Sequence, residues 1–238
     1  MLKFAEFSGQ SGNSNQSALS RAEQAYSRLR DAIHAGDLKP GDRLIEEKLG
    51  RMLGFSRTPV HEALARLESD GLARKDPSRG MVVVEFDASM IAELYAVRET
   101  LEGTAAALAA RHASEGEIIA LKQIADRDRG LSQDPKRLAS NNRIFHDALY
   151  RSAHNRYLLK TLKALYESMA LVRTSLAYNP QRIKLTIEQH QRIVAAIERQ
   201  DSKDAEELAR THVRDAGKAR LALMFGIQDE ISGARRKK

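Results

Sequence analysis

Apolar residues recur along this chain with two different spacings, which change near residue 86. Before that point the apolar stretches are short and are separated by glycine or proline. One example is the helical face of Tyr26, Leu29 and Ile33, which stops at Gly36. Beyond residue 86, long segments rich in alanine and leucine carry the helical period of about 3.6 residues. The pattern predicts a small domain of mixed structure followed by an all-helical domain.

The residues from 44 to 72 have the pattern of two helices joined by a tight turn. The first helix is apolar at Leu49 and stops at Gly54, and Ser56 is placed to cap the second by accepting a free backbone N–H. The second helix carries an apolar stripe at helical spacing, formed by Val60, Leu64 and Leu67. This arrangement is typical of the helix-turn-helix motif, whose second helix enters the major groove of DNA.

Polar residues stand at the start of that second helix, off its apolar stripe. We expect Arg57 to recognise guanine through paired hydrogen bonds to N7 and O6. Thr58 and His61 would add contacts to bases or phosphates. Arg66, farther along the same helix, is a further candidate for DNA contact. The sequence therefore predicts a DNA-reading helix.

Two short strands at 72–74 and 81–84, with a turn at 76–80, complete the winged form of this motif. The tip of the turn carries Arg79 and the flexible Gly80. We expect these two residues to reach the minor groove or the DNA backbone. The wing thus adds a predicted DNA contact to that of the helix.

Helical segments fill the rest of the chain and are separated by short loops. Asp87 or Ser89 caps the first, and Ser114 with Glu117 gives the second a cap and a first-turn acid. The expected spans are 87–112, 114–129, 136–152, 156–177, 180–200 and 201–225. Loops this short make neighbouring helices pack together, so the sequence predicts a mainly α protein whose second domain is an antiparallel helical bundle.

Composition narrows the class of protein. The net charge of +7 does not locate a nucleic-acid site, because the first 86 residues hold 13 Lys and Arg against 12 Asp and Glu. The chain has no cysteine, hence no disulfide or thiolate metal site, and no apolar run that approaches a membrane span. We expect a disordered polar arm at 1–16, without a signal peptide, and a solvated basic tail at 227–238. Between them lie the winged helix-turn-helix domain at 17–86 and the helical domain at 87–226.

Three histidines of the helical domain need partners if they lie in its core, because unpaired polar groups are costly there. They are His146, His190 and His212, on three different helices, and Asn142 stacks one turn before His146. Three converging imidazoles with a fourth oxygen donor would form a divalent-metal site. The alternative is three separately hydrogen-bonded histidines, and the spacing leaves both open.

Arg98 lies on an otherwise apolar helix, where its guanidinium also needs a partner. One interpretation is an intrahelical pair with Glu102, four residues later. The other is a two-pronged clamp for the carboxylate of a ligand. Arg173 is a second candidate for such a clamp.

Specific motifs are found in the first third of the chain. They are Pro40-Gly41-Asp42-Arg43-Leu44, Ser56-Arg57-Thr58-Pro59-Val60, Glu62-Ala63-Leu64 with Leu67, and Gly71-Leu72. They resemble the winged helix of the GntR family of bacterial transcription regulators. His61 departs from the pattern, since the family usually has an arginine there that contacts DNA. This departure bears on affinity or base preference and not on the fold.

A second set of motifs spans the helical domain. They are Leu94–Glu102, Asn142–His146, Glu188–His190 with Ala195–Ile197, and His212. They resemble the FCD effector-binding domain of FadR-type GntR regulators. The resemblance implies a divalent metal held by Asn142, His146, His190 and His212, with zinc first and nickel, manganese or iron as other candidates. It also implies that Arg98 binds a carboxylate. Asn142 would supply a neutral oxygen, so no protein ligand would be anionic.

The resemblance implies a cytoplasmic transcription regulator that acts as a homodimer and binds a short inverted repeat in double-stranded DNA. A small carboxylate effector would bridge the metal and Arg98, and most relatives of this type are repressors that the effector releases. A metal-dependent hydrolase is one alternative, because three histidines can leave a position for an activated water. The other alternative is a regulator with a metal-free ligand pocket.

Overall fold

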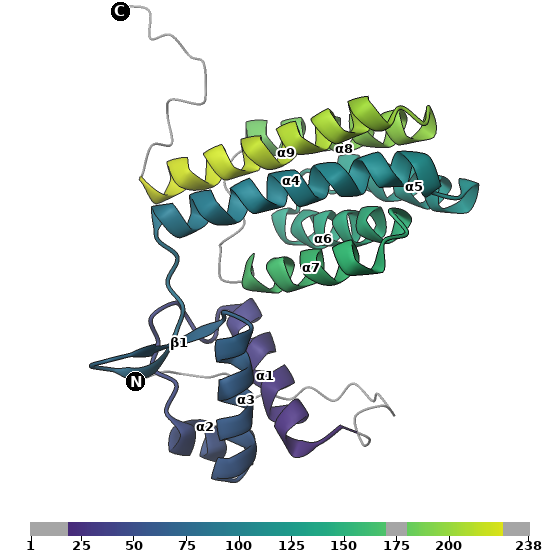
Figure 1. Cartoon of the computed structure of the whole chain (residues 1–238). Coiled ribbons are helices and arrows are strands. Elements are labelled where there is room, and N and C mark those ends of the chain that lie inside the picture. Colours follow the sequence, from purple (N-terminus) through teal and green to yellow (C-terminus); the bar gives the residue numbers. More distant parts are fainter. Residues whose placement is uncertain (1–18, 170–179, 226–238) are drawn as a thin grey trace, which may run out of the picture. The chain divides into compact units, whose positions relative to one another are not determined.

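The structure is a computed structural model, and it describes residues 19–169 and 180–225. The predicted arm at 1–16 and tail at 227–238 lie outside these residues. The described residues divide into two compact units, 19–86 with 167–169 and 87–166 with 180–225. The first holds three helices and a small sheet. In the second, the described secondary structure consists of helices (Figure 1). The fold is therefore the expected winged helix-turn-helix joined to a helical domain.

The first unit is ordered along the chain as three helices and a two-stranded sheet. Its elements are α1 (Arg21–Ala35), α2 (Glu46–Leu53), α3 (Arg57–Ser69), β1 (Ala73–Asp76) and β2 (Gly80–Val83). A capping box between Ser20 and Glu23 opens α1, and Gly36 ends it with φ 81°. The buried core includes Tyr26, Leu29, Leu49, Val60, Leu67 and Val83. These residues are the apolar positions from which the elements were predicted.

The turn between α2 and α3 is tight because of two glycines. Gly54 ends α2 in the left-handed region, with φ 73°. A Cβ on Gly50 would lie 2.8 Å from the carbonyl oxygen of Phe55, so a larger residue would push the turn apart. Ser56 occupies the N-cap position of α3, but its side chain makes no capping hydrogen bond, contrary to the expectation. The backbone turn, and not a side-chain cap, therefore sets the start of α3.

The wing is an antiparallel pair in which Ala73 lies opposite Val83 and Asp76 opposite Gly80. An Asp76 oxygen accepts hydrogen bonds from the backbone N–H and hydroxyl of Ser78 and from the backbone N–H of Arg79. Gly80 has φ 75°, a conformation that favours glycine. The loop tip is thus held by its own side chains and backbone.

The second unit consists, in its described residues, of helices joined by short loops. They are α4 (Ala88–His112), α5 (Glu115–Gly130), α6 (Pro135–Ser152), α7 (Arg156–Ser168), α8 (Pro180–Glu198) and α9 (Ser202–Met224). Asp87, rather than Ser89, caps α4 by accepting from the Met90 N–H. The expected end of the fourth helix at Ala177 lies outside the described residues. None of the described helices is long and apolar enough to cross a membrane.

Small residues bring α4 and α9 close together, and the two helices lie side by side in Figure 1. A Cβ on Gly217 would lie 3.0 Å from the ring of Tyr95, and one on Gly103 would lie 2.7 Å from the Arg210 side chain. The core beside this pair is built from alanines of α4 together with larger side chains of α6 and α8, such as Phe145 and Ile193. This packing forms the bundle interior in which the polar residues of the second unit meet.

Candidate metal centre and nucleic-acid interface

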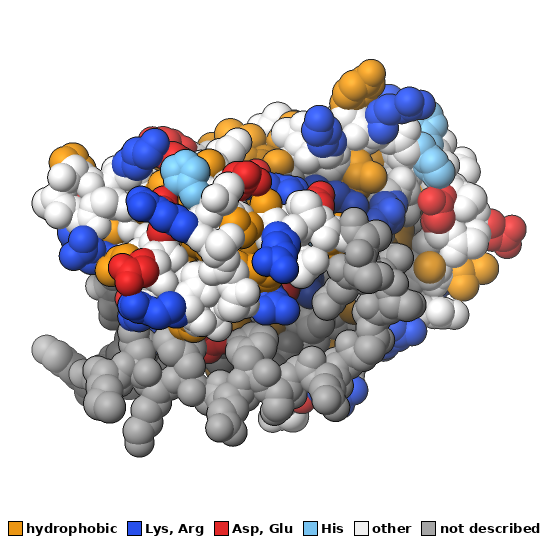
Figure 2. Space-filling model, turned by 90° about the horizontal axis from the view of Figure 1, so that it is seen from below, with side chains coloured by type: hydrophobic (Ala, Val, Ile, Leu, Met, Phe, Trp, Pro, Cys, Tyr) orange, Lys and Arg blue, Asp and Glu red, His pale blue; other side chains and the backbone are white. Residues whose placement is uncertain are grey.

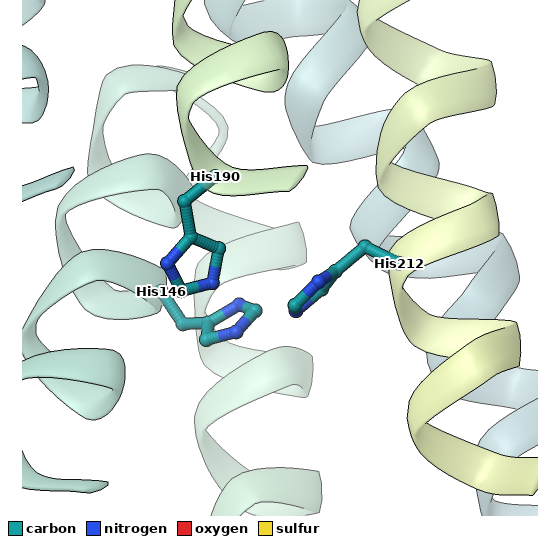
Figure 3. A group of neighbouring side chains, drawn as sticks. All are labelled: His146, His190 and His212. Atoms are coloured by element: carbon teal, nitrogen blue, oxygen red, sulfur yellow. The ribbon is translucent and has the colours of Figure 1, made fainter. Parts of the chain in front are cut away.

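Three imidazoles meet in the interior of the second unit. His146 comes from α6, His190 from α8 and His212 from α9, and all three are buried. One nitrogen from each ring lies within 4.8 Å of the others. Figure 3 shows the rings facing one another from their separate helices. The structure thus brings together three of the four residues expected to hold a metal.

The ring of His190 is oriented by a carboxylate. Its Nδ1 lies 2.8 Å from Oδ2 of Asp128, and the side-chain amide of Asn141 donates to the other oxygen of that carboxylate at 2.7 Å. Because an ionised carboxylate only accepts, Nδ1 carries the proton and Nε2 presents a lone pair. That Nε2 is buried and has no hydrogen-bond partner among the described residues. It is therefore available to a metal ion.

The ring of His212 faces an acceptor oxygen in the same way, whereas that of His146 has an ion-pair contact alone. Nδ1 of His212 lies 3.0 Å from Oε1 of Gln189, whose amide nitrogen donates to Asp215 at 2.8 Å. Nδ1 of His146 lies 3.0 Å from Oε2 of Glu102 as an ion-pair contact, but it makes no hydrogen bond among the described residues. An oxygen partner on one ring nitrogen is the usual support for a metal ligated by the other. The donor set fits a divalent metal on these grounds.

Burial favours the neutral form of His190 and His212. The pKa of His190 is lowered to about 4, because burial and the neighbouring His146 together outweigh the opposing effect of Asp128. Burial and the neighbouring rings also hold the pKa of His212 well below its usual value. Neutral imidazoles at physiological pH are the form that binds a metal.

Arg98 is buried on α4 and is paired with Glu102. Its Nε and Nη2 each lie 2.7 Å from Oε1 of Glu102, and its guanidinium covers the ring of Tyr95. Burial alone would raise the pKa of Glu102, but Arg98 and His146 together lower it to about 2. The intrahelical pair that the spacing allowed is therefore present. It connects Arg98 through one carboxylate to the histidine cluster.

Of the two further expected site residues, Asn142 contacts a tyrosine and Arg173 is not described. Asn142 lies one turn before His146 on α6, and its amide nitrogen is 3.5 Å from the hydroxyl of Tyr166. Arg173 lies outside the described residues. The bundle site is thus described by three histidines, Arg98 and their carboxylate partners.

Sequence reasoning missed the residues behind the imidazoles, above all Asp128 and Gln189. A signal for Asp128 was present, because Leu121, Ala125 and Asp128 follow each other at helical spacing and all are buried. An acid on an apolar face needs a partner, as Arg98 did. No comparable signal marks Gln189, whose side chain contacts Arg182 on its own helix and His212 and Asp215 on α9.

The start of α3 exposes two of the predicted DNA contacts beside a carboxylate of α2. The side chains of Arg57 and His61 are 84% and 70% exposed. Nε of Arg57 donates to Glu46 at 2.6 Å, and Nδ1 of His61 lies 2.7 Å from the other oxygen of Glu46. Thr58 is exposed beside them. These three residues share the surface that the helix-turn-helix geometry predicts for base recognition.

The remaining predicted contacts lie elsewhere on the first unit. Arg66 is on the last turn of α3, where its guanidinium covers the ring of Tyr26 at 4.1 Å. Arg79, at the wing, lies 3.3 Å from Asp76, and Gly80 begins β2. Figure 2 shows Lys and Arg side chains spread over the face seen from below, with Asp and Glu among them. Among the described residues visible in this view, acidic and basic side chains are therefore mixed.

Comparisons with known proteins identify a family for each of the two units. The profile "Bacterial regulatory proteins, gntR family" matches residues 21–83, and the profile "FCD domain" matches residues 93–215. These ranges contain the exposed start of α3 and the three buried histidines, respectively.

Individual relatives cover most of the chain. The "Probable D-xylose utilization operon transcriptional repressor" of Paenarthrobacter nicotinovorans is 33% identical over 188 residues, which are 76% of this chain and 80% of that protein. The "Glc operon transcriptional activator" of Escherichia coli is 28% identical over 208 residues, 77% of this chain and 82% of that protein. The solved structure "E. coli McbR/YncC" has 26% identity and a TM-score of 0.71, and the match covers 87% of this chain and 99% of that one. This chain therefore belongs to the GntR family of bacterial transcriptional regulators, with an FCD domain as its second part.

Proposed function

We propose that this protein regulates transcription in response to a small carboxylate that binds beside a metal ion in the FCD domain. The observation that supports the metal is the arrangement of three buried imidazoles. Each has an acceptor oxygen within 3.0 Å of Nδ1, and the three rings offer nitrogens to one centre. Three separately satisfied core histidines would not need to share a centre.

The proposed ligands are His146, His190 and His212, with the side-chain oxygen of Asn142 as the fourth. Imidazole and oxygen donors suit zinc first, with nickel, manganese and iron as other candidates. When bound, the metal supplies positive charge to the site and a coordination position for an anionic ligand. Because no direct protein ligand is anionic, Asp128 behind His190 provides negative charge beside the metal, whereas the charge of Glu102 is already paired with Arg98.

Arg98 is the proposed contact for the effector carboxylate, with Arg173 as the second candidate. Glu102 already pairs with Arg98, so an effector would compete with an internal carboxylate for the same guanidinium. Such an effector needs a second attractive contact besides Arg98, and coordination to the metal would provide that contact. A small acid that can reach both groups is the ligand class that we propose.

The DNA side of the proposal is a homodimer that places two copies of α3 on a short inverted repeat, in the cytoplasm. Arg57 would recognise guanine, Thr58 and His61 would contact bases or phosphates, and the wing would follow the backbone. We propose repression with release by the effector; of the two relatives named above, one is described as a repressor and the other as an activator. The regulator is favoured over a hydrolase because both carboxylates that contact the histidines are engaged behind the rings.

Metal analysis of purified protein tests this function. We expect close to one equivalent of bound metal in the wild type and little in His146→Ala or His190→Ala, with helical content unchanged by circular dichroism. His112→Ala is the matched control, because His112 is an exposed histidine at the end of α4. Wild-type metal content in both cluster variants would refute the site.

The effector side is tested by Arg98→Ala in calorimetry with zinc and then with a panel of small carboxylic acids. We expect this variant to keep the metal and to bind operator DNA, while its response to the acid is lost. A variant that responds as strongly as the wild type would remove Arg98 from the effector site.

A further inference from the structure

One carboxylate on α2 holds two residues of the DNA-reading helix. Glu46 is the first residue of α2, and its two oxygens are divided between Arg57 at 2.6 Å and His61 at 2.7 Å. The Glu46 side chain is only 24% exposed, although both partners are largely exposed. The contact therefore reaches from the first helix of the motif to the reading face of the second.

The atoms used in this contact leave the base-reading atoms free. Arg57 binds Glu46 through Nε, which leaves the N–H groups of its two terminal nitrogens for the paired acceptors of guanine. His61 uses Nδ1 and keeps Nε2 for DNA. Arg57 and His61 are four residues apart, so both stand on one face of α3. Glu46 thus limits the rotamers of both side chains before DNA arrives, which lowers the entropy cost of binding.

The charge of Glu46 works against general affinity for DNA. Hydrogen bonds from His61 and Arg57 lower the pKa of its carboxyl, so it is ionised at neutral pH. A negative charge on a DNA-facing surface repels phosphates and cancels part of the attraction that Arg57 exerts on any sequence. We expect this repulsion to lower the affinity for operator and for random DNA equally. The orientation of Arg57 and His61, in contrast, raises only the affinity that depends on base recognition.

We propose that Glu46 is a positioning residue for base recognition, which lowers affinity for random DNA and raises the preference for the operator. The proposal rests on the proposed role of Arg57 and His61 as DNA contacts. Its partner is a G-containing half-site of duplex DNA, recognised in the major groove. Glu46 need not touch the DNA itself.

The next residue offers a matched control. Glu47 is also in the first turn of α2, its side chain is 77% exposed, and its ion-pair partner is Arg51 on the same helix. Glu47→Gln removes the same charge as Glu46→Gln but leaves Arg57 and His61 held. A difference between the two variants therefore isolates the contact from the charge.

The experiment uses the full-length protein and an operator selected from random duplexes by the wild type. Dissociation constants are measured by fluorescence anisotropy on that operator and on a scrambled duplex, at several salt concentrations. For Glu46→Gln we expect tighter binding to the scrambled duplex and a fall of about five- to tenfold in the operator preference. For Glu47→Gln we expect binding to both duplexes to tighten equally, with the preference unchanged. Equal preferences in the two variants would overturn the proposal.

Two further variants separate this proposal from the role on which it rests. Arg57→Ala and His61→Ala should each lower the operator preference, and adding Glu46→Gln to the double variant should lower it no further. A lowered preference in Arg57→Ala beside a wild-type preference in Glu46→Gln would refute the positioning role alone. Unchanged preference in Arg57→Ala, His61→Ala and Glu46→Gln would refute both.

Discussion

In two regions of this molecule a glutamate bridges an arginine and a histidine. On the winged helix Glu46 holds Arg57 and His61, whose side chains are 84% and 70% exposed. In the FCD domain Glu102 lies between Arg98 and His146, and the side chains of this trio are at most 5% exposed. The residue types are the same, but water reaches only the first trio.

Exposure decides what each trio can do. Water solvates the members of an exposed ion pair, so the contact adds little to stability, and the atoms that it does not use remain open to DNA. In the bundle, a member that loses its partner stays buried with an unpaired charge, which is costly. The outer trio is therefore suited to orient side chains that still face DNA, and the inner trio is suited to hold a ring and a guanidinium in fixed positions.

The largest expected effect is on the inner trio. Glu102→Gln should lower the free energy of unfolding of the metal-free protein by about 3–5 kcal/mol, because it leaves the buried Arg98 without its carboxylate. Urea denaturation followed by circular dichroism measures this. Glu99→Gln is the control, since Glu99 lies on the same helix and pairs with the more exposed Arg214. An equal loss in both variants would break the comparison.

The second-largest expected effect is a loss of stability of the metal-free protein in acid, caused by the buried histidines. The pKa of His190 is near 4 in the folded protein against 6.5 in an unfolded chain, so the unfolded state binds more protons between these values. Stability of the metal-free protein should therefore fall as the pH drops from 6.5 toward 4, by about 3 kcal/mol for His190 alone. Denaturation at a series of pH values measures the slope. His190→Gln should flatten it and His61→Gln should not; equal slopes in all three proteins would contradict the prediction.

The carboxylate behind His190 should act on metal affinity. We expect Asp128→Asn to weaken zinc binding by about 10- to 100-fold, because the amide orients the ring and supports its basicity less well. Competition with a zinc indicator gives the affinity. Asp126→Asn, an exposed position on the same helix, should bind zinc as the wild type does. An unaltered affinity for Asp128→Asn would leave Asp128 a purely structural partner.

The smallest expected effect on stability is at the outer trio. Glu46→Gln should change the free energy of unfolding by less than about 1 kcal/mol, the usual range for a solvated ion pair. The same urea denaturation measures it beside Glu102→Gln. A loss as large as that of the inner variant would show that exposure does not separate the two trios.

Much of the fold was predictable because it depends on neighbours in the sequence. The capping boxes at Ser20 and Ser114 and the glycine stop at Gly36 are contacts within one or two helical turns. Ser56 shows the limit of this argument: it stands at the N-cap of α3 but makes no capping bond, because the tight backbone turn already sets that helix start. Residue type allowed the cap, and local geometry decided otherwise.

The site was predictable in part. The sequence by itself determined the helices, their buried faces and the presence of histidines and Arg98 on those faces, since these follow from spacing. Only the tertiary structure decided that Asp128 meets His190 across 62 residues and that Gln189 meets His212 across 23. It also decided that the guanidinium of Arg98 forms its ion pair with Glu102. Spacing fixes which side of a helix a residue occupies, whereas the oxygen that faces each nitrogen depends on how the helices pack.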